Sequence, residues 1–209
     1  QKSLHFLFFL SLLLFLLPSC NDGPQLKQNV SGKTGEVVVV MNKGYWEAGP
    51  GQALRSILAV DFPHLPQREP LFSLFNIQEN AFSSLFQVHR NIILCHSKSE
   101  LSEAKIVIQR DIWAAPQIVI TISGPDEETI TACIDQNSDL LKNALEQAER
   151  NRVIQNSKKY EEVATRKTVL KAIGGSPYFP IGYRIKKQTG NFIWVAYETT
   201  YTTQGVFIY

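Results

Sequence analysis

The apolar run from Leu4 to Leu17 limits what the rest of the chain can fold into. It holds 14 residues, nearly all Leu or Phe, with Lys2 before it and Cys20 shortly after it. A charged start, an apolar run and a small-residue processing site are the parts of a secretory signal peptide. A helix needs about 20 residues to cross the hydrocarbon core of a bilayer, so this run is short for a membrane span. We therefore expect residues 1–19 to be a signal peptide that takes no part in the fold.

The end of this run predicts a lipid anchor. Leu17-Pro18-Ser19-Cys20 resembles the lipobox of bacterial lipoproteins, in which the thiol receives diacylglycerol and the chain is cut just before the cysteine. The alternatives are an ordinary signal peptide with an incidental cysteine, or a short membrane helix. Each buried CH₂ of an acyl chain contributes about 0.8 kcal/mol, so a lipidated Cys20 holds a domain at a membrane without a spanning helix. The polar residues 20–35 are then predicted to be a lipidated, flexible tether.

The mixed order of strand and helix signals after residue 35 predicts an α+β fold with mixed sheets, a long helical segment and two lobes. We place an α/β lobe at 36–155, and a helix with antiparallel strands, an incomplete second lobe, at 156–209. A loop is expected from Asn42 to Gly49, before a helix that begins at Pro50. The remaining helical signal lies near 79–86 and from 124 to 173, with a break near 155–157. Strands are expected at 36–41, 71–77, 88–95, 106–108, 117–123, 182–187, 192–198 and 205–209.

The net charge of +2 hides an asymmetry along the chain. Residues 36–149 carry 15 acids and 8 bases, whereas residues 150–187 carry 10 bases and 2 acids. One interpretation is a basic surface for an anionic lipid, a glycan or a protein partner. The other, which we favour, is a solvated helix face that complements the acidic part of the same protein. We expect no nucleic-acid partner.

Motifs for cofactors and metals are incomplete. Ser31-Gly32-Lys33-Thr34 contains part of a phosphate loop, but Lys27 stands where the partner glycine belongs and the motif precedes its strand. The cluster of His64, His89, Cys95 and His96 lacks the spacing of zinc ligands. We therefore predict no cofactor and no metal.

The sequence does not decide whether the two cysteines after Cys20 form a disulfide. Cys95 and Cys133 would meet an oxidising compartment after export, where a disulfide forms. Two separate buried thiols are the alternative, since Cys is among the most buried residue types.

Three polar stretches inside apolar context supply the candidate ligand site. Glu69, Arg90 and Asp111 would form a network that lines a groove beside Trp113. The alternative is that these charges pair with one another and fix strand register. No Gly-x-Ser-x-Gly, His-Glu-x-x-His or paired-carboxylate motif is present, so no catalytic residue is predicted.

Several segments of the chain together resemble an uncharacterised family of bacterial envelope lipoproteins, catalogued as a domain of unknown function. The resemblance spans nearly the whole chain after the leader, and it implies no activity. It also implies that members continue beyond Tyr209. The segments that carry it, besides the residues that end at Cys20, are Gly35 to Val40, Leu65 to Pro70, His89 to Ile92, Trp113 to Gln117, Ala148 to Arg152 and Asn191 to Trp194.

These features together lead to one functional hypothesis and one alternative. We expect a lipid-anchored protein of the cell envelope, facing the periplasm at the outer membrane, that binds or scaffolds an envelope partner or ligand. The alternative is a hydrolase that acts on envelope material.

Overall fold

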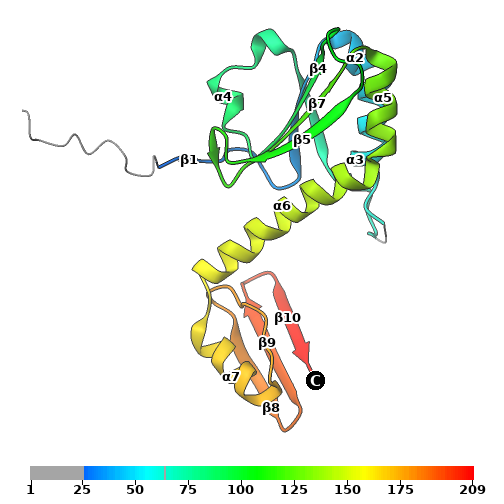
Figure 1. The fold of residues 1–209 in the computed structure, drawn as a ribbon. Helices are drawn as coiled ribbons and strands as arrows, with labels where there is room; N and C mark the ends of the chain where they lie inside the picture. The colour runs from blue at the N-terminus through cyan, green and yellow to red at the C-terminus, as the bar shows by residue number, and fades with distance from the viewer. Residues whose placement is uncertain (1–25, 64) are drawn as a thin grey trace, which may run out of the picture.

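A computed structural model describes residues 26–63 and 65–209, so the predicted signal peptide and Cys20 lie outside the described residues. Figure 1 shows two lobes joined by the long helix α6 (Ser138–Lys159). The first lobe is built on a five-stranded sheet and the second on a three-stranded sheet. Helices occur together with parallel and antiparallel strand pairs, so the fold is α+β, as predicted.

The sheet of the first lobe has the strand order β3-β2-β4-β7-β5, in which β5 runs antiparallel to its neighbour β7 and the other pairs are parallel. Its inner strands are runs of Val and Ile, which is typical of strands covered on both faces. Val37 to Val40 accordingly are all buried. The strands are β2 (Glu36–Val40), β3 (Ser73–Ile77), β4 (Asn91–Ser97), β5 (Lys105–Arg110) and β7 (Ile118–Gly124).

Three helices pack on one face of this sheet and bury the larger core. They are α3 (Gly49–Leu58), α5 (Glu127–Gln136) and the first half of α6. Pro50 lies in the first turn of α3, which confirms the predicted helix start. The predicted loop before it is wrong in part, because α2 (Lys43–Glu47) forms there and the Asn42 side chain accepts a hydrogen bond from its first turn.

The opposite face of the sheet has a smaller cover. The short helices η1 (Glu79–Ala81) and α4 (Ser84–Gln87) lie on this side, in place of the single helix expected near 79–86. Phe82 packs edge-on against Trp113, with ring centroids 5.6 Å apart. The buried side chains beneath them are Val38, Val40, Ile92 and Val119.

The parallel strands β2, β4 and β7 begin at one edge of the sheet and end at the other. The amino edge contains their first residues, Glu36, Asn91 and Ile118, and the carboxyl edge contains their last, Val40, Ser97 and Gly124. In open α/β sheets, ligand sites usually lie outside the carboxyl ends. The two edges are therefore described separately below.

Helix α6 crosses the predicted lobe boundary at residue 155 without interruption. The predicted break at 155–157 is wrong: the helix continues to Lys159, and α7 (Val163–Ile173) starts three residues beyond Tyr160. The second half of α6 is mostly exposed, and polar residues with good helix propensity, such as Gln155, are favourable there. The real interruption lies earlier, at Asn137 between α5 and α6. No helix in residues 26–63 and 65–209 is both long and apolar enough to cross a membrane.

The second lobe packs α7 against an antiparallel sheet. Gly174 ends α7 in a left-handed conformation, with φ of 80°, which confirms the predicted helix end. β8 and β9 form an antiparallel hairpin, with Thr189 opposite Phe192, where antiparallel strands are expected at 182–187 and 192–198. Its core consists of Val169, Phe179, Ile193 and Val195. The strands are β8 (Arg184–Thr189), β9 (Phe192–Glu198) and β10 (Thr203–Ile208).

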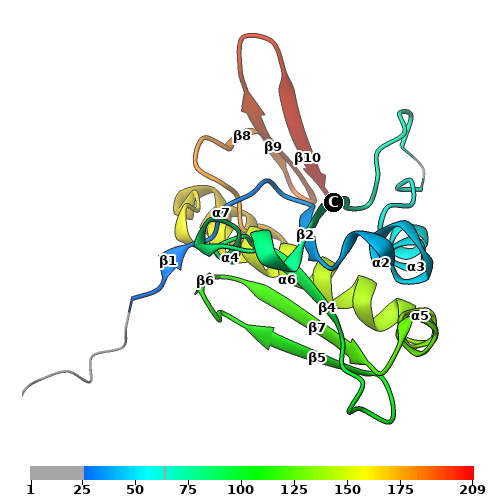
Figure 2. The same cartoon turned by 90° about the horizontal axis from the view of Figure 1, so that it is seen from above.

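Residues 26–35 form an arm that joins the first lobe. Strand β1 (Gln28–Asn29) pairs in parallel with β6 (Ala114–Ala115), and Figure 2 shows the two side by side. Ser31 then forms a β-bridge with His89. Its N–H donates to the Val88 carbonyl at 2.9 Å, and its carbonyl accepts from Arg90 N–H at 3.1 Å. The prediction of a flexible tether is therefore wrong for residues 28–35, which hydrogen-bond to the lobe.

Candidate functional site

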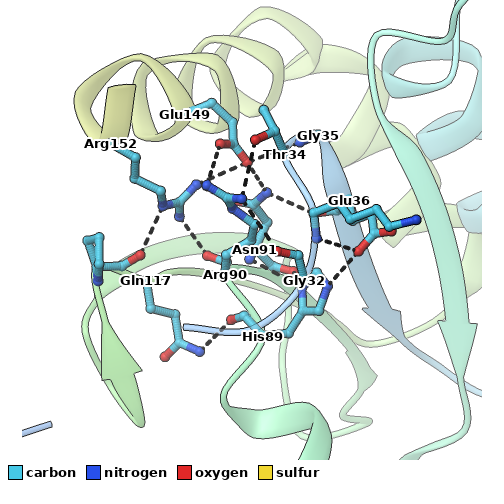
Figure 3. Close-up of polar contacts among 12 residues, drawn as sticks. Gly32, Thr34, Gly35, Glu36, His89, Arg90, Asn91, Gln117, Glu149 and Arg152 are labelled. Carbon is cyan, nitrogen blue, oxygen red and sulfur yellow. Dashed lines mark hydrogen bonds and ion pairs between the residues drawn. The ribbon is translucent and has the colours of Figure 1, made fainter. Parts of the chain in front are cut away.

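Polar side chains from four segments meet at the amino edge of the sheet, as Figure 3 shows. The arm and the start of β2 supply one side, the residues before β4 and β7 supply the base, and α6 covers them. We call this cluster the amino-edge network. Its members are Glu36, His89, Arg90, Asn91, Gln117, Glu149 and Arg152.

One carboxylate serves two guanidinium groups at the centre of the network. Glu149 Oε2 lies 3.0 Å from Arg90 Nη2, and its Oε1 lies 3.1 Å from Arg152 Nη1. All three side chains are nearly buried, with exposed fractions of 15% for Arg90, 12% for Glu149 and 8% for Arg152. Removing one member of such a buried group strands the others without a partner, which costs far more than an exposed pair.

Arg152 ties α6 to two loops and a strand. Its Nε donates to the Pro116 carbonyl at 2.9 Å, its Nη1 to Asn91 Oδ1 at 2.9 Å, and its Nη2 to the Arg90 carbonyl at 2.7 Å. Burial lowers the pKa of Arg152, and the positive charges of Arg90 and Arg110 lower it further, against the opposing effect of Glu149. The guanidinium is therefore well bonded but sits in a region with excess positive charge.

Asn91 connects the same helix to β2. Its Nδ2 donates to the Glu36 carbonyl and to Glu149 Oε1, both at 2.8 Å, and the residue is fully buried. Gly35 N–H also donates to Glu149 Oε1, at 3.2 Å. The hydrogen bonds of the buried Asn91 amide therefore fix the position of α6 relative to β2 and β4.

The arm enters the network beside His89 and Glu36. Gly32 has φ of 88°, and a Cβ there would lie 2.2 Å from His89 Nε2, so only glycine fits. His89 Nε2 lies 3.6 Å from a Glu36 carboxylate oxygen. The backbone N–H of Lys33 donates to that carboxylate at 2.7 Å and is the main cause of its lowered pKa, with His89 adding to it.

The structure does not bring the predicted set together. Arg90 pairs with Glu149, and not with Glu69 or Asp111. Glu69 lies in the loop before β3, where its carbonyl accepts from Phe62 N–H at 2.7 Å. Asp111 has φ of 54° and accepts from Gln117 N–H at 2.7 Å, while Trp113 packs on Phe82. The prediction that Glu69, Arg90 and Asp111 pair with one another is therefore wrong. Glu69 and Asp111 instead make hydrogen bonds within the loops that contain them.

The carboxyl edge holds fewer polar contacts, and they are more exposed. His96 Nδ1 lies 3.0 Å from Glu79 Oε1, and Ser97 Oγ donates to the Pro125 carbonyl at 3.1 Å. Cys95 and Cys133 are unbonded thiols, and burial raises the pKa of Cys95 to about 12. Within the described residues, which exclude His64, no three His, Cys, Asp or Glu side chains are grouped as metal ligands.

A groove of about 660 Å³ lies next to the network, between the arm, the second half of α6 and the start of the second lobe. Arg90, Arg152 and Lys159 line it, together with Tyr160 and Pro180. The charged members of the network that the sequence did not indicate include Glu149 and Arg152, both on α6. The other members outside the predicted set are Glu36, His89, Asn91 and Gln117. A signal for Arg152 exists, since Leu141, Leu145 and Ala148 form a buried stripe that Arg152 continues at helical spacing.

The model of a family described as a domain of unknown function (DUF8532) matches residues 30–158. No curated protein and no solved structure matches. The matched region starts within the arm and ends one residue before the end of α6, so it includes every member of the amino-edge network.

Proposed function

We propose that this chain, which belongs to the family described as domain of unknown function (DUF8532), is a lipid-anchored envelope protein that binds or scaffolds a periplasmic partner. The observation that carries the proposal is the leader, in which the apolar run from Leu4 to Leu17 is followed directly by the lipobox-like residues up to Cys20. Acyl chains on Cys20 would supply the attachment, at about 0.8 kcal/mol for each buried CH₂.

The arm supports a short connection to the membrane. Because β1 begins at Gln28, seven residues, Asn21 to Lys27, lie between Cys20 and the first strand. Seven extended residues span at most about 25 Å. A lipidated Cys20 therefore keeps the amino edge of the first lobe close to the bilayer surface.

The contacts of the network support a binding or scaffolding role over hydrolysis. Its charged groups pair with one another and hold the arm, the sheet and α6 in one arrangement. At the carboxyl edge, the Ser97 hydroxyl already donates to a carbonyl, and the raised pKa of Cys95 keeps its thiol protonated at neutral pH. A nucleophile needs an adjacent base or a lowered pKa, and neither residue has that activation.

The test is metabolic labelling of the full chain with an alkyne fatty acid, followed by separation of membranes. We expect the wild type to carry label and to sit in the membrane fraction, and Cys20→Ser to lose the label. Cys133→Ser is the matched control and should keep it. Label retained in Cys20→Ser would end the anchor proposal.

The binding part of the proposal has its own test. Cross-linking of the full anchored chain in intact cells, followed by mass spectrometry, should yield one or a few envelope proteins in stoichiometric amounts. Release of a cleaved glycan, peptide or lipid product by the purified chain would instead support the hydrolase alternative.

A further inference from the structure

The groove beside the amino-edge network has a positive charge that its own residues do not balance. Three cationic side chains line it, Arg90, Arg152 and Lys159, and none of the described residues that line it is acidic. Glu149 lies behind the wall and pairs with both arginines. Three positive charges and one negative charge leave a local excess of two.

Arg90 has bonding capacity left over. Its Nη1 makes only long contacts, 3.5 Å to the Gly32 carbonyl and 3.4 Å to Thr34 Oγ1. Its Nε is buried and has no hydrogen-bond partner among the described residues. A buried N–H without an acceptor is costly, and a guanidinium favours acceptors that carry negative charge. The proximity of Arg90 to Arg152 makes an anion at this wall still more favourable.

We propose that this groove binds the phosphate group of a small, hydroxyl-bearing phosphate ester. A phosphate monoester carries a charge of about −1.5 to −2 at neutral pH, which matches the local excess. Arginine side chains bind phosphate through directed N–H groups, and a lysine in the lining adds a point charge. The volume of about 660 Å³ is far larger than phosphate alone needs and lies within the usual range for small-molecule sites.

The remaining wall suits the hydroxyl groups of such a ligand. Asn29 of the arm, together with Asn156 and Ser157 of α6, provides amide and hydroxyl groups around the cations. Tyr160 and Pro180 line the groove as well, so a bound ligand contacts the arm, α6 and the beginning of the second lobe. Because the arm leads towards Cys20, the phosphate can come from a lipid headgroup as well as from a free ester.

The inference depends on the groove alone and not on the lipid anchor, so it can fail or hold independently of the proposed function. The experiment is calorimetric titration of the full chain in detergent solution. The probes are glucose 1-phosphate with glucose as its uncharged counterpart, and dihexanoyl phosphatidic acid with glycerol 3-phosphate. We expect the phosphate esters to bind and glucose to give no heat, and raising the salt from about 0.05 M to about 0.3 M to weaken the binding.

Two neighbouring lysines provide a matched pair of variants. Lys159→Gln removes one lining charge and should weaken phosphate-ester binding about fivefold, the effect of one partly exposed ion pair. Lys158→Gln makes the same change one residue away, where the side chain lies over the Tyr178 ring and outside the groove, and should leave binding unchanged. Both residues are exposed, so both variants keep the buried network.

The outcomes separate cleanly. Tighter binding of phosphatidic acid than of glycerol 3-phosphate assigns the site to a lipid headgroup, and the reverse order assigns it to a free ester. Equal heats for glucose and glucose 1-phosphate, or an equal loss in the two lysine variants, would overturn the proposal.

Discussion

The amino and carboxyl edges of the same sheet differ in how they hold charge. At the amino edge, Arg90, Glu149 and Arg152 are almost completely withdrawn from solvent and share hydrogen bonds with Asn91. At the carboxyl edge, the closest acid–base pair is His96 with Glu79, and half of the Glu79 side chain is exposed. Buried charge is expensive unless fully paired, so the first arrangement must contribute something that the second does not.

The difference indicates which edge organises the protein. The buried charges at the amino edge come from two segments, Arg90 before β4 and Glu149 with Arg152 on α6, so their pairing fixes α6 on the sheet. The hydrogen bond from Gly35 N–H to Glu149 holds the arm in the same arrangement. The His96–Glu79 pair links two segments near the surface, and water can replace either partner. The carboxyl edge, where ligands usually bind in such sheets, therefore has fewer buried polar contacts here than the amino edge.

The largest difference in stability is expected when the same substitution, Glu to Gln, is made at each edge. Glu149→Gln removes the charge shared by two buried arginines and should lower the free energy of unfolding by about 3 kcal/mol. Glu79→Gln removes an exposed carboxylate and should cost less than about 0.5 kcal/mol. Urea unfolding of the full-length chain measures both. Similar losses in the two variants would mean that the edges do not differ.

A smaller effect is expected where the arm passes His89. Gly32→Ala places a methyl group into the imidazole in a left-handed backbone conformation, which should cost about 2 kcal/mol and loosen the arm. Gly175→Ala has open space around it and no positive φ, so its effect should lie within about 0.5 kcal/mol. Hydrogen exchange at the Ser31 amide, which donates to the Val88 carbonyl, reports the loosening. Unchanged protection at Ser31 in Gly32→Ala would contradict a fixed arm.

The smallest effect is a pH dependence from Glu36. Its pKa is lowered in the folded protein from an ordinary value of 4.5, by Lys33 N–H first and then by His89. A carboxyl with a lowered folded pKa stabilises the fold above its unfolded pKa, and that stability is lost as the pH falls through the folded value. The stability difference between wild type and Glu36→Gln should therefore shrink between pH 6 and pH 3. Unfolding curves at several pH values test this, and a constant difference would rule it out.

Much of the fold follows from local patterns. The run of valines in β2 and Pro50 at the start of α3 behave as isolated sequence signals predict. Gly174 likewise ends α7 where its pattern says it should. Errors arise where tertiary contacts decide: β1 has only two residues and depends on pairing with β6, and Gln155 to Ser157 stay helical because α6 continues into the second lobe.

The site was predicted with the right arginine and the wrong partners. Arg90 stands out in the sequence because it belongs to a short polar stretch, His89-Arg90-Asn91, that interrupts apolar context. Its carboxylate partner is 59 residues away on α6, and nothing in the spacing connects the two. Glu69 and Asp111 are nearer in sequence, but both belong to turns that use their own backbone contacts. Pairing between distant charges depends on how helices dock, which local periodicity does not describe.

The hydrogen bonds of Arg152 have a consequence for how the chain is made. Its acceptors on Pro116, Asn91 and Arg90 precede it by 36, 61 and 62 residues. Because the chain is synthesised from its amino end, the first lobe lacks these hydrogen bonds until Arg152 has emerged from the ribosome. The hydrogen bonds that fix α6 on the first lobe therefore form late in synthesis, after every strand of the five-stranded sheet has emerged.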